Sequence, residues 1–188
     1  RTRLHARKGY GRLIVGRWGH FGEGNFINAH EGTLRIGDNT VFGRHNTVQS
    51  YLDVEIGGKG IIADWIYICD FDHVFADIDR PITEQGIVKS PVRIGPDVWI
   101  GTKVSVLRGT TVGHGCVLAA NSVVRGNVPP MSVMGGVPAR LLKDRVGEDR
   151  AAEQQRIGVA DIARKTAKAA KEHALSQTWG RVEMAGLM

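Results

Sequence analysis

The sequence predicts an all-β protein, built as a parallel β-helix from short repeats. Aliphatic residues recur every six positions in the middle of the chain, and a small residue follows most of them. The series is Ile94, Ile100, Val106, Val112, Leu118 and Val124. This period fits neither a helix, whose period is about 3.6, nor a simple strand, whose period is about 2. It is the period of hexapeptide β-helices, in which each repeat supplies one short strand and one tight corner.

The same period extends toward the N-terminus in three further runs. These runs are Val15, Phe21 and Ile27; Ile36, Phe42 and Val48; and Ile56, Ile62 and Ile68. Because three hexapeptides close one triangular coil, we expect about five coils, which begin at Val15, Ile36, Ile56, Ile94 and Val112. A single repeat leaves its apolar face open, whereas stacked coils bury a continuous column.

Composition divides the chain into four segments. We expect residues 1–14 to form a basic N-terminal lead-in, 15–126 the β-helix, 127–147 a closing segment, and 148–188 a helix and tail. The helix is expected because Gly and β-branched residues give way to Ala, Glu, Lys, Arg and Gln in residues 148–178. A long excursion at residues 69–93 interrupts the β-helix. Excursions of this kind are usually functional.

The net charge of +6 is concentrated at one end of the chain, since residues 1–20 hold six Arg and Lys and no acidic residue. This segment suits either a solvated cap or a weak contact with an anionic lipid surface. Nucleic-acid binding is not expected, because aromatic interleaving and a nucleic-acid motif are both missing. No apolar run approaches the length of about 18 residues that a membrane span needs.

Cys69 and Cys116 lie at core-type positions of the repeats. This placement argues against a disulfide scaffold, and a reducing cytoplasm is the expected compartment.

The excursion carries the expected chemistry. His73 stands near its start, with Asp70 and Asp72 before it and Asp77 and Asp79 after it. A histidine titrates near neutral pH, so it is a natural general base for taking a proton from a hydroxyl, and nearby carboxylates can orient it.

Three stretches of the chain resemble the hexapeptide-repeat acetyltransferases, in particular the galactoside, maltose, nodulation and xenobiotic O-acetyltransferases. They are residues 91–101 (PVRIGPDVWIG), the coil at 113–124 and the closing sequence GGVPAR at 135–140. The resemblance covers about residues 15–143. It implies a left-handed β-helix, acetyl-coenzyme A as donor, and a homotrimer with each active site between two subunits.

The resemblance also implies roles for individual residues. His73 matches the catalytic histidine, and Trp99 matches the tryptophan beside the acceptor site and the pantetheine arm. Thr102 takes the place of a residue whose backbone amide holds the thioester carbonyl, and Ala120 that of a backbone contact to pantetheine. Three basic residues are assigned to the coenzyme A phosphates: Arg140, Lys143 and, where many relatives have Thr-Lys, Arg125.

The acceptor site is less well defined by the resemblance. Relatives of the galactoside type hold the acceptor with an upstream asparagine and aspartate, and the stretch at residues 42–53 does not align cleanly with theirs. The candidates here are Asn46 and Asp53, together with Asp70 and Asp72 beside the histidine. A sugar, a glycan and a drug alcohol all stay open as acceptors, as does the length of the acyl chain.

The implied reaction is direct transfer of an acetyl group to a hydroxyl of a sugar or glycan, with His73 as base. Two alternatives remain. A γ-carbonic-anhydrase-like metalloenzyme shares this β-helix but needs three imidazoles on zinc, including a closely spaced pair. Because the sequence has no such pair near His73 or His114, we expect no metal. A non-catalytic β-helix that serves as an assembly scaffold would keep the repeats and lose the chemistry.

Overall fold

The computed structural model describes residues 1–146 and Arg164. The helix and tail expected at residues 148–188, like residue 147 of the closing segment, lie outside the described residues except for Arg164. Residues 1–145 form one unit.

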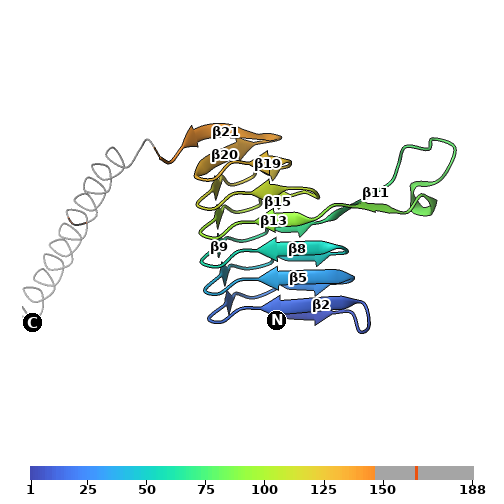
Figure 1. The fold of residues 1–188 in the computed structure, drawn as a ribbon, viewed down its shortest axis with the longest axis horizontal. Helices are drawn as coiled ribbons and strands as arrows, with labels where there is room; N and C mark the ends of the chain where they lie inside the picture. Colours follow the sequence, from blue (N-terminus) through green and yellow to red (C-terminus); the bar gives the residue numbers. More distant parts are fainter. Residues whose placement is uncertain (147–163, 165–188) are drawn as a thin grey trace, which may run out of the picture. The chain divides into compact units, whose positions relative to one another are not determined.

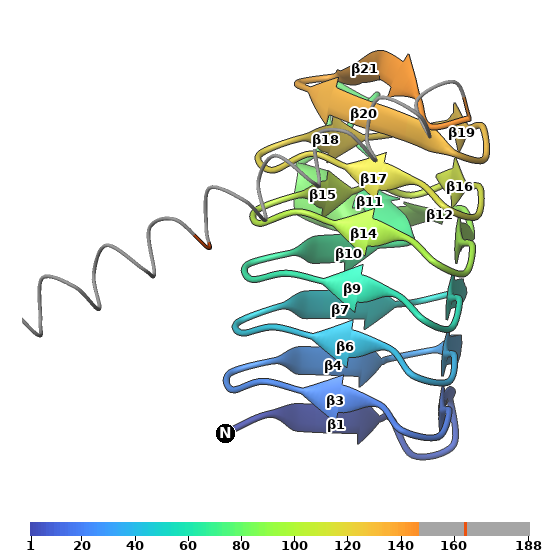
Figure 2. The same cartoon turned by 90° about the vertical axis from the view of Figure 1, so that its left-hand side faces the viewer.

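Parallel strands stack into three sheets, which are the faces of a β-helix (Figures 1 and 2). Face A holds β1 (Arg3–Ala6), β4 (Phe26–Ala29), β7 (Thr47–Ser50), β10 (Tyr67–Cys69), β15 (Ser105–Val106) and β18 (Val123–Val124). Face B holds β2 (Gly11–Val15), β5 (Gly32–Ile36), β8 (Asp53–Ile56), β13 (Val92–Ile94), β16 (Thr111–Val112) and β19 (Asn127–Val128). Face C holds β3 (His20–Phe21), β6 (Val41–Phe42), β9 (Ile61–Ile62), β14 (Trp99–Ile100), β17 (Val117–Leu118), β20 (Ser132–Gly136) and β21 (Ala139–Asp144).

The predicted hexapeptide register is confirmed on all three faces. On face B, for example, the expected first residues of the coils pair in order from Val15 through Ile36, Ile56 and Ile94 to Val112. From Ile27 to Val128 the residues of these columns are at most 3% exposed. They form one continuous apolar core, consistent with the left-handed β-helix that the resemblance implies.

The β-helix has six coils, where about five were expected. Coil 1 consists of β1, β2 and β3, so residues 1–14 hold β1 and most of β2. Its β2 and β3 hold the expected Val15 and Phe21, whereas the apolar pattern of β1 is masked in the sequence because Arg3 and His5 stand on either side of Leu4. Coil 6 consists of β18, β19 and β20, and β21 folds back antiparallel onto β20.

Tight corners join the faces, and we name each edge by the two faces it connects. At the B–C edge one residue of each coil takes a left-handed backbone, as in Asn39 (φ 57°), Lys59 (φ 60°) and Asp97 (φ 57°). Successive coils approach closely here. A Cβ added to Gly57 would lie 2.5 Å from backbone atoms of Gly95 and Pro96, so only glycine fits at that position.

The predicted excursion leaves coil 4 after β10 and returns at β13. It forms an antiparallel hairpin of β11 (Phe71–His73) and β12 (Ile87–Lys89), joined by a segment that contains the short helix η1 (Ile82–Glu84). The hairpin projects from the A–B edge, away from the stacked coils (Figure 1).

Candidate active site

His73 is the last residue of β11, and its side chain is exposed. It lies opposite Ile87 of β12, and Phe71 lies opposite Lys89. The Phe71 ring has its centroid 4.4 Å from that of Tyr51 in coil 3 and 6.3 Å from that of His73. The histidine therefore stands just outside the body of the β-helix, on a hairpin whose base packs against an aromatic ring.

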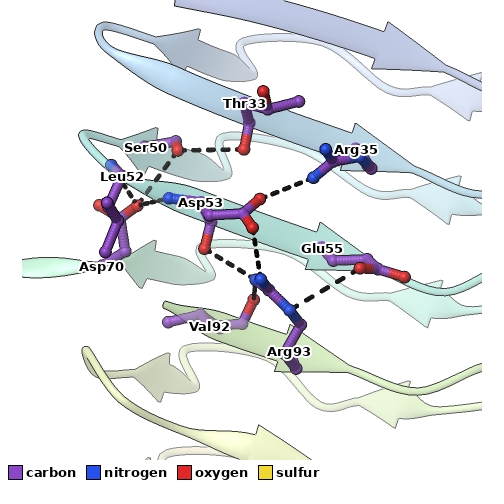
Figure 3. Close-up of polar contacts among 9 residues, drawn as sticks. All are labelled: Thr33, Arg35, Ser50, Leu52, Asp53, Glu55, Asp70, Val92 and Arg93. Carbon is purple, nitrogen blue, oxygen red and sulfur yellow. Dashed lines mark hydrogen bonds and ion pairs between the residues drawn. The ribbon is translucent and has the colours of Figure 1, made fainter. Parts of the chain in front are cut away.

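Asp70 ties the start of the excursion to coil 3 (Figure 3). Its carboxylate accepts hydrogen bonds from the backbone N–H groups of Tyr51 (2.7 Å), Leu52 (2.8 Å) and Asp53 (2.8 Å), and from the Ser50 hydroxyl (3.1 Å). The side chain is fully buried. Buried carboxylates are stable when they are hydrogen-bonded in this way.

Asp53 lies on face B between two arginines (Figure 3). Arg35 Nη1 lies 2.7 Å from Asp53 Oδ1, and Arg93 Nη2 binds Asp53 Oδ2. Arg93 Nη1 also donates to the Asp53 carbonyl at 3.0 Å. Since Arg93 follows the return of the excursion, both ends of the excursion are tied to residues 51–53.

Asn46 is fully buried at the C–A edge. Its backbone N–H donates to Asn25 Oδ1 (2.9 Å), and its own Oδ1 accepts from the backbone N–H of Ile66 (2.7 Å). It is thus part of an internal ladder that links successive coils.

These placements divide the four acceptor candidates. Asn46 and Asp70 are buried and engaged with backbone groups. Asp53 is held in ion pairs on face B. Asp72 lies on the hairpin beside His73, but its Oδ2 is 2.6 Å from Arg108 Nε.

The residues expected to bind coenzyme A lie on other parts of the β-helix. Trp99 is 53% exposed on face C. Thr102 and Ala120 occupy corresponding corners of coils 4 and 5 at the C–A edge, where the N–H of Asn121 donates to the Thr102 carbonyl (2.9 Å).

The expected phosphate-binding residues are split between two places. Arg140 and Lys143 lie on β21, at the end of face C. Arg125 is exposed at the A–B edge, between β18 and β19. The structure therefore groups Arg140 and Lys143 with Trp99 on face C and sets Arg125 apart from them.

We call the expected coenzyme A residues on face C and at the C–A edge the face C group: Trp99, Thr102, Ala120, Arg140 and Lys143. His73 does not meet this group within one chain. The histidine stands off the A–B edge, whereas Trp99 and Thr102 belong to face C and the C–A edge, so face A lies between them. In Figure 2 face C is turned to the viewer and the hairpin lies behind the body.

Both cysteines are free and buried, as expected. Burial raises the pKa of Cys69 and of Cys116 above the ordinary thiol value. Because the thiolate is the nucleophile, neither cysteine is suited to form an acyl-enzyme. Burial also raises the pKa of the neighbouring Tyr67 to about 12.

No three His, Cys, Asp or Glu side chains form a potential metal-binding group in the part of the chain that the structure describes. Three imidazoles on one zinc, which the carbonic-anhydrase alternative requires, are therefore not assembled in residues 1–146.

Several contacts around the hairpin were not predicted from the sequence. Arg108 pairs with Asp72 from coil 5, and Lys89 Nζ binds Glu31 Oε2 of coil 2. The hydrogen bond from Lys89 lowers the pKa of Glu31. A charged residue at an exposed corner is ordinary in a repeat, so the sequence holds no signal for these contacts.

Comparisons with known proteins agree with this fold. Residues 91–126 match the family model described as bacterial transferase hexapeptide (six repeats). A hexapeptide-repeat-containing acetyltransferase of Vibrio cholerae, solved with acetyl-coenzyme A, is 30% identical with a TM-score of 0.60, and the match covers 73% of each chain. The chain belongs to the hexapeptide-repeat acetyltransferase family.

Two curated proteins show how much of a longer family member this chain spans. It is 54% identical to a probable acetyltransferase of Mycobacterium tuberculosis over 87% of this chain and 56% of that protein. It is 36% identical to a candidate O-acetyl transferase of lipopolysaccharide biosynthesis from Escherichia coli, over 60% of this chain and 61% of that protein. The family member described here thus spans somewhat over half the length of these relatives. Among its described residues, no helix has the length and apolar character to cross a membrane.

Proposed function

We propose that this chain transfers an acetyl group from acetyl-coenzyme A to a hydroxyl of a sugar or glycan. Membership in the acetyltransferase family supports the reaction, and the complex of the Vibrio cholerae relative with acetyl-coenzyme A supports the donor. The name of the Escherichia coli relative, which refers to lipopolysaccharide, supports a glycan acceptor.

In the proposed mechanism the imidazole of His73 accepts the proton of the acceptor hydroxyl as the oxygen attacks the thioester carbonyl. The tetrahedral intermediate then collapses, the C–S bond breaks, and the imidazolium returns the proton to the leaving thiolate. The Thr102 backbone amide stabilises the oxyanion, a contribution of about 2.7–4 kcal/mol for such a donor. The burial of both thiols is consistent with direct transfer and no acyl-enzyme.

The observation that carries this proposal is the separation of His73 from the face C group. A hairpin that projects from the body is suited to reach a second subunit, so we place each active site between two subunits of a homotrimer. In that assembly His73 of one subunit serves the coenzyme A groove that a neighbouring copy forms at Trp99, Thr102 and Ala120, with Arg140 and Lys143 near the phosphates. Arg125 at the A–B edge is a further phosphate contact in this arrangement.

A weak contact of coil 1 with an anionic lipid surface is a second part of the proposal. Arg3 and Arg12 are exposed in this coil, and so are Tyr10 (64% exposed) and Trp18 (82% exposed). Basic and aromatic side chains together favour the interface of an anionic membrane.

The proposed reaction is tested by thiol release from acetyl-coenzyme A in the presence of monosaccharides, oligosaccharides, glycolipids and chloramphenicol-like alcohols. With an acceptor that the wild-type protein uses, His73→Asn should lower kcat by about 10²–10⁴-fold, because it removes the general base. The KM for acetyl-coenzyme A should change little. His114→Ala is the matched control, since this exposed corner histidine lies at the B–C edge. Near-wild-type turnover of His73→Asn would rule out this base.

A further inference from the structure

The β11–β12 hairpin has two faces, and His73 lies on only one of them. Side chains alternate along a strand, and residues directly opposite on the paired strand share a face. Phe71 and His73 therefore share one face with their partners Lys89 and Ile87. Asp72 points to the other face, with its partner Val88.

The first face is turned toward the N-terminal coils. Phe71 packs against Tyr51 of coil 3 at 4.4 Å between ring centroids. Lys89 Nζ binds Glu31 of coil 2 and lies 5.8 Å from the centroid of the Tyr51 ring. His73, on the same face, therefore points toward coils 2 and 3.

The second face is held from the opposite direction. Asp72 Oδ2 lies 2.6 Å from Nε of Arg108, which belongs to the corner between β15 and β16 in coil 5. The hairpin leaves from coil 4 and is contacted by coils 2 and 3 on one face and by coil 5 on the other. The Gly109 N–H of coil 5 also donates to the Ser90 carbonyl at the base of the hairpin (3.1 Å), so the Arg108–Asp72 pair is the side-chain contact that acts on β11 itself.

We propose that the Arg108–Asp72 ion pair is a positioning pair, which fixes the rotation of the hairpin and so directs His73 toward the N-terminal coils. This inference rests on the proposed function of His73 as general base. Neither Arg108 nor Asp72 touches a reacting atom, and both act through the histidine.

An ion pair of this kind is expected to matter less for the stability of the fold than for the position of the His73 side chain. The side chains of Arg108 and Asp72 are 35% and 47% exposed, and partly exposed ion pairs add little to the stability of a fold. Catalytic geometry is more demanding, since a displacement of about 1 Å can cost about 100-fold in rate. The pair should therefore affect turnover far more than folding.

The test compares Arg108→Met, Arg108→Lys and Asp72→Asn. Arg17→Met is the matched control, because Arg17 pairs with Asp38 at 3.4 Å on another edge, away from the hairpin. Arg108→Met and Asp72→Asn should each lower kcat about 10- to 100-fold, with the melting temperature and the KM for acetyl-coenzyme A unchanged. The double variant should lose no more than either single one. Arg108→Lys should recover part of the loss, because it keeps the charge without the planar guanidinium.

A readout independent of activity separates this inference from the proposed function. The NMR signals of the His73 ring, assigned from their loss in His73→Asn, should shift in Arg108→Met as the ring moves relative to Phe71, and should stay in place in Arg17→Met. Unchanged His73 signals in Arg108→Met would overturn the positioning role, whatever the activity. Equal kinetic losses in Arg17→Met would overturn it too. Absence of thiol release in the wild type would contradict the proposed function alone, because the NMR comparison still applies.

Discussion

At the scale of single residues, Asp70 shows how a buried carboxylate can organise a loop. Its four hydrogen-bond partners all lie within residues 50–53 of coil 3. Three of them are the backbone N–H groups of Tyr51, Leu52 and Asp53. The excursion therefore begins from a fixed point, and the hairpin contacts that follow set its direction.

We expect Asp70→Asn to destabilise the fold by about 2–4 kcal/mol, because the new amide turns an N–H₂ group toward backbone donors that lose a charged acceptor. Urea unfolding measures the change. Asp38→Asn is the control, since Asp38 also accepts a backbone hydrogen bond, from Arg17 N–H at 2.7 Å, but at an exposed corner. If Asp70→Asn lost no more unfolding free energy than Asp38→Asn, the hydrogen bonds to the Asp70 carboxylate would contribute little to stability.

The acceptor candidates illustrate what the sequence could not resolve at this scale. Asp70 and Asp72 both stand just before His73 in the chain, yet Asp70 is buried in the body and Asp72 pairs with Arg108. The difference arises because the chain leaves its coil between them. Distance along the sequence does not reveal which way a side chain points where the repeat breaks off.

At the scale of elements, the repeat was the most predictable feature. A six-residue period places the aliphatic residues at the same point of successive hexapeptides, one on each face in turn, so the columns from Ile27 to Val124 follow from the spacing. Val15 and Phe21 of the first coil were predicted, but strand β1 was missed because Arg3 and His5 stand on either side of Leu4, and this hides the period. The hairpin contacts were missed because their partners lie in coils 2, 3 and 5, far apart in sequence.

Strand β21 gives a prediction at this scale. Arg140→Ala and Lys143→Ala should each raise the KM for acetyl-coenzyme A several-fold and change kcat less, because contacts to a distant phosphate contribute equally to ground state and transition state. Steady-state kinetics with acetyl-coenzyme A and its 3′-dephospho form measure the effect. Arg145, whose Nη1 donates to the Gly115 carbonyl, is outside the proposed groove, and Arg145→Met serves as the control. If both donors responded identically to the β21 variants, β21 would not bind the 3′-phosphate.

At the scale of the whole molecule, the described fold separates a projecting histidine from an exposed face that carries the other expected site residues. The six stacked coils form a rigid spacer, since their core is continuous and in register on every face. Bringing His73 to Trp99 within one chain would require the hairpin to cross face A. In the proposed homotrimer, association of copies would bring them together without deforming any coil.

The central claim, a site shared between two subunits, is tested most directly by mixed trimers. One variant, His73→Ala, lacks the base, and the other, Ala120→Trp, fills the proposed pantetheine groove. Each alone should be inactive while still forming trimers by light scattering. Co-expressed in equal amounts, they should recover about a quarter of the wild-type activity, because a histidine from one variant meets an intact groove from the other at one site in four. Mixed trimers that stay inactive would contradict the shared site.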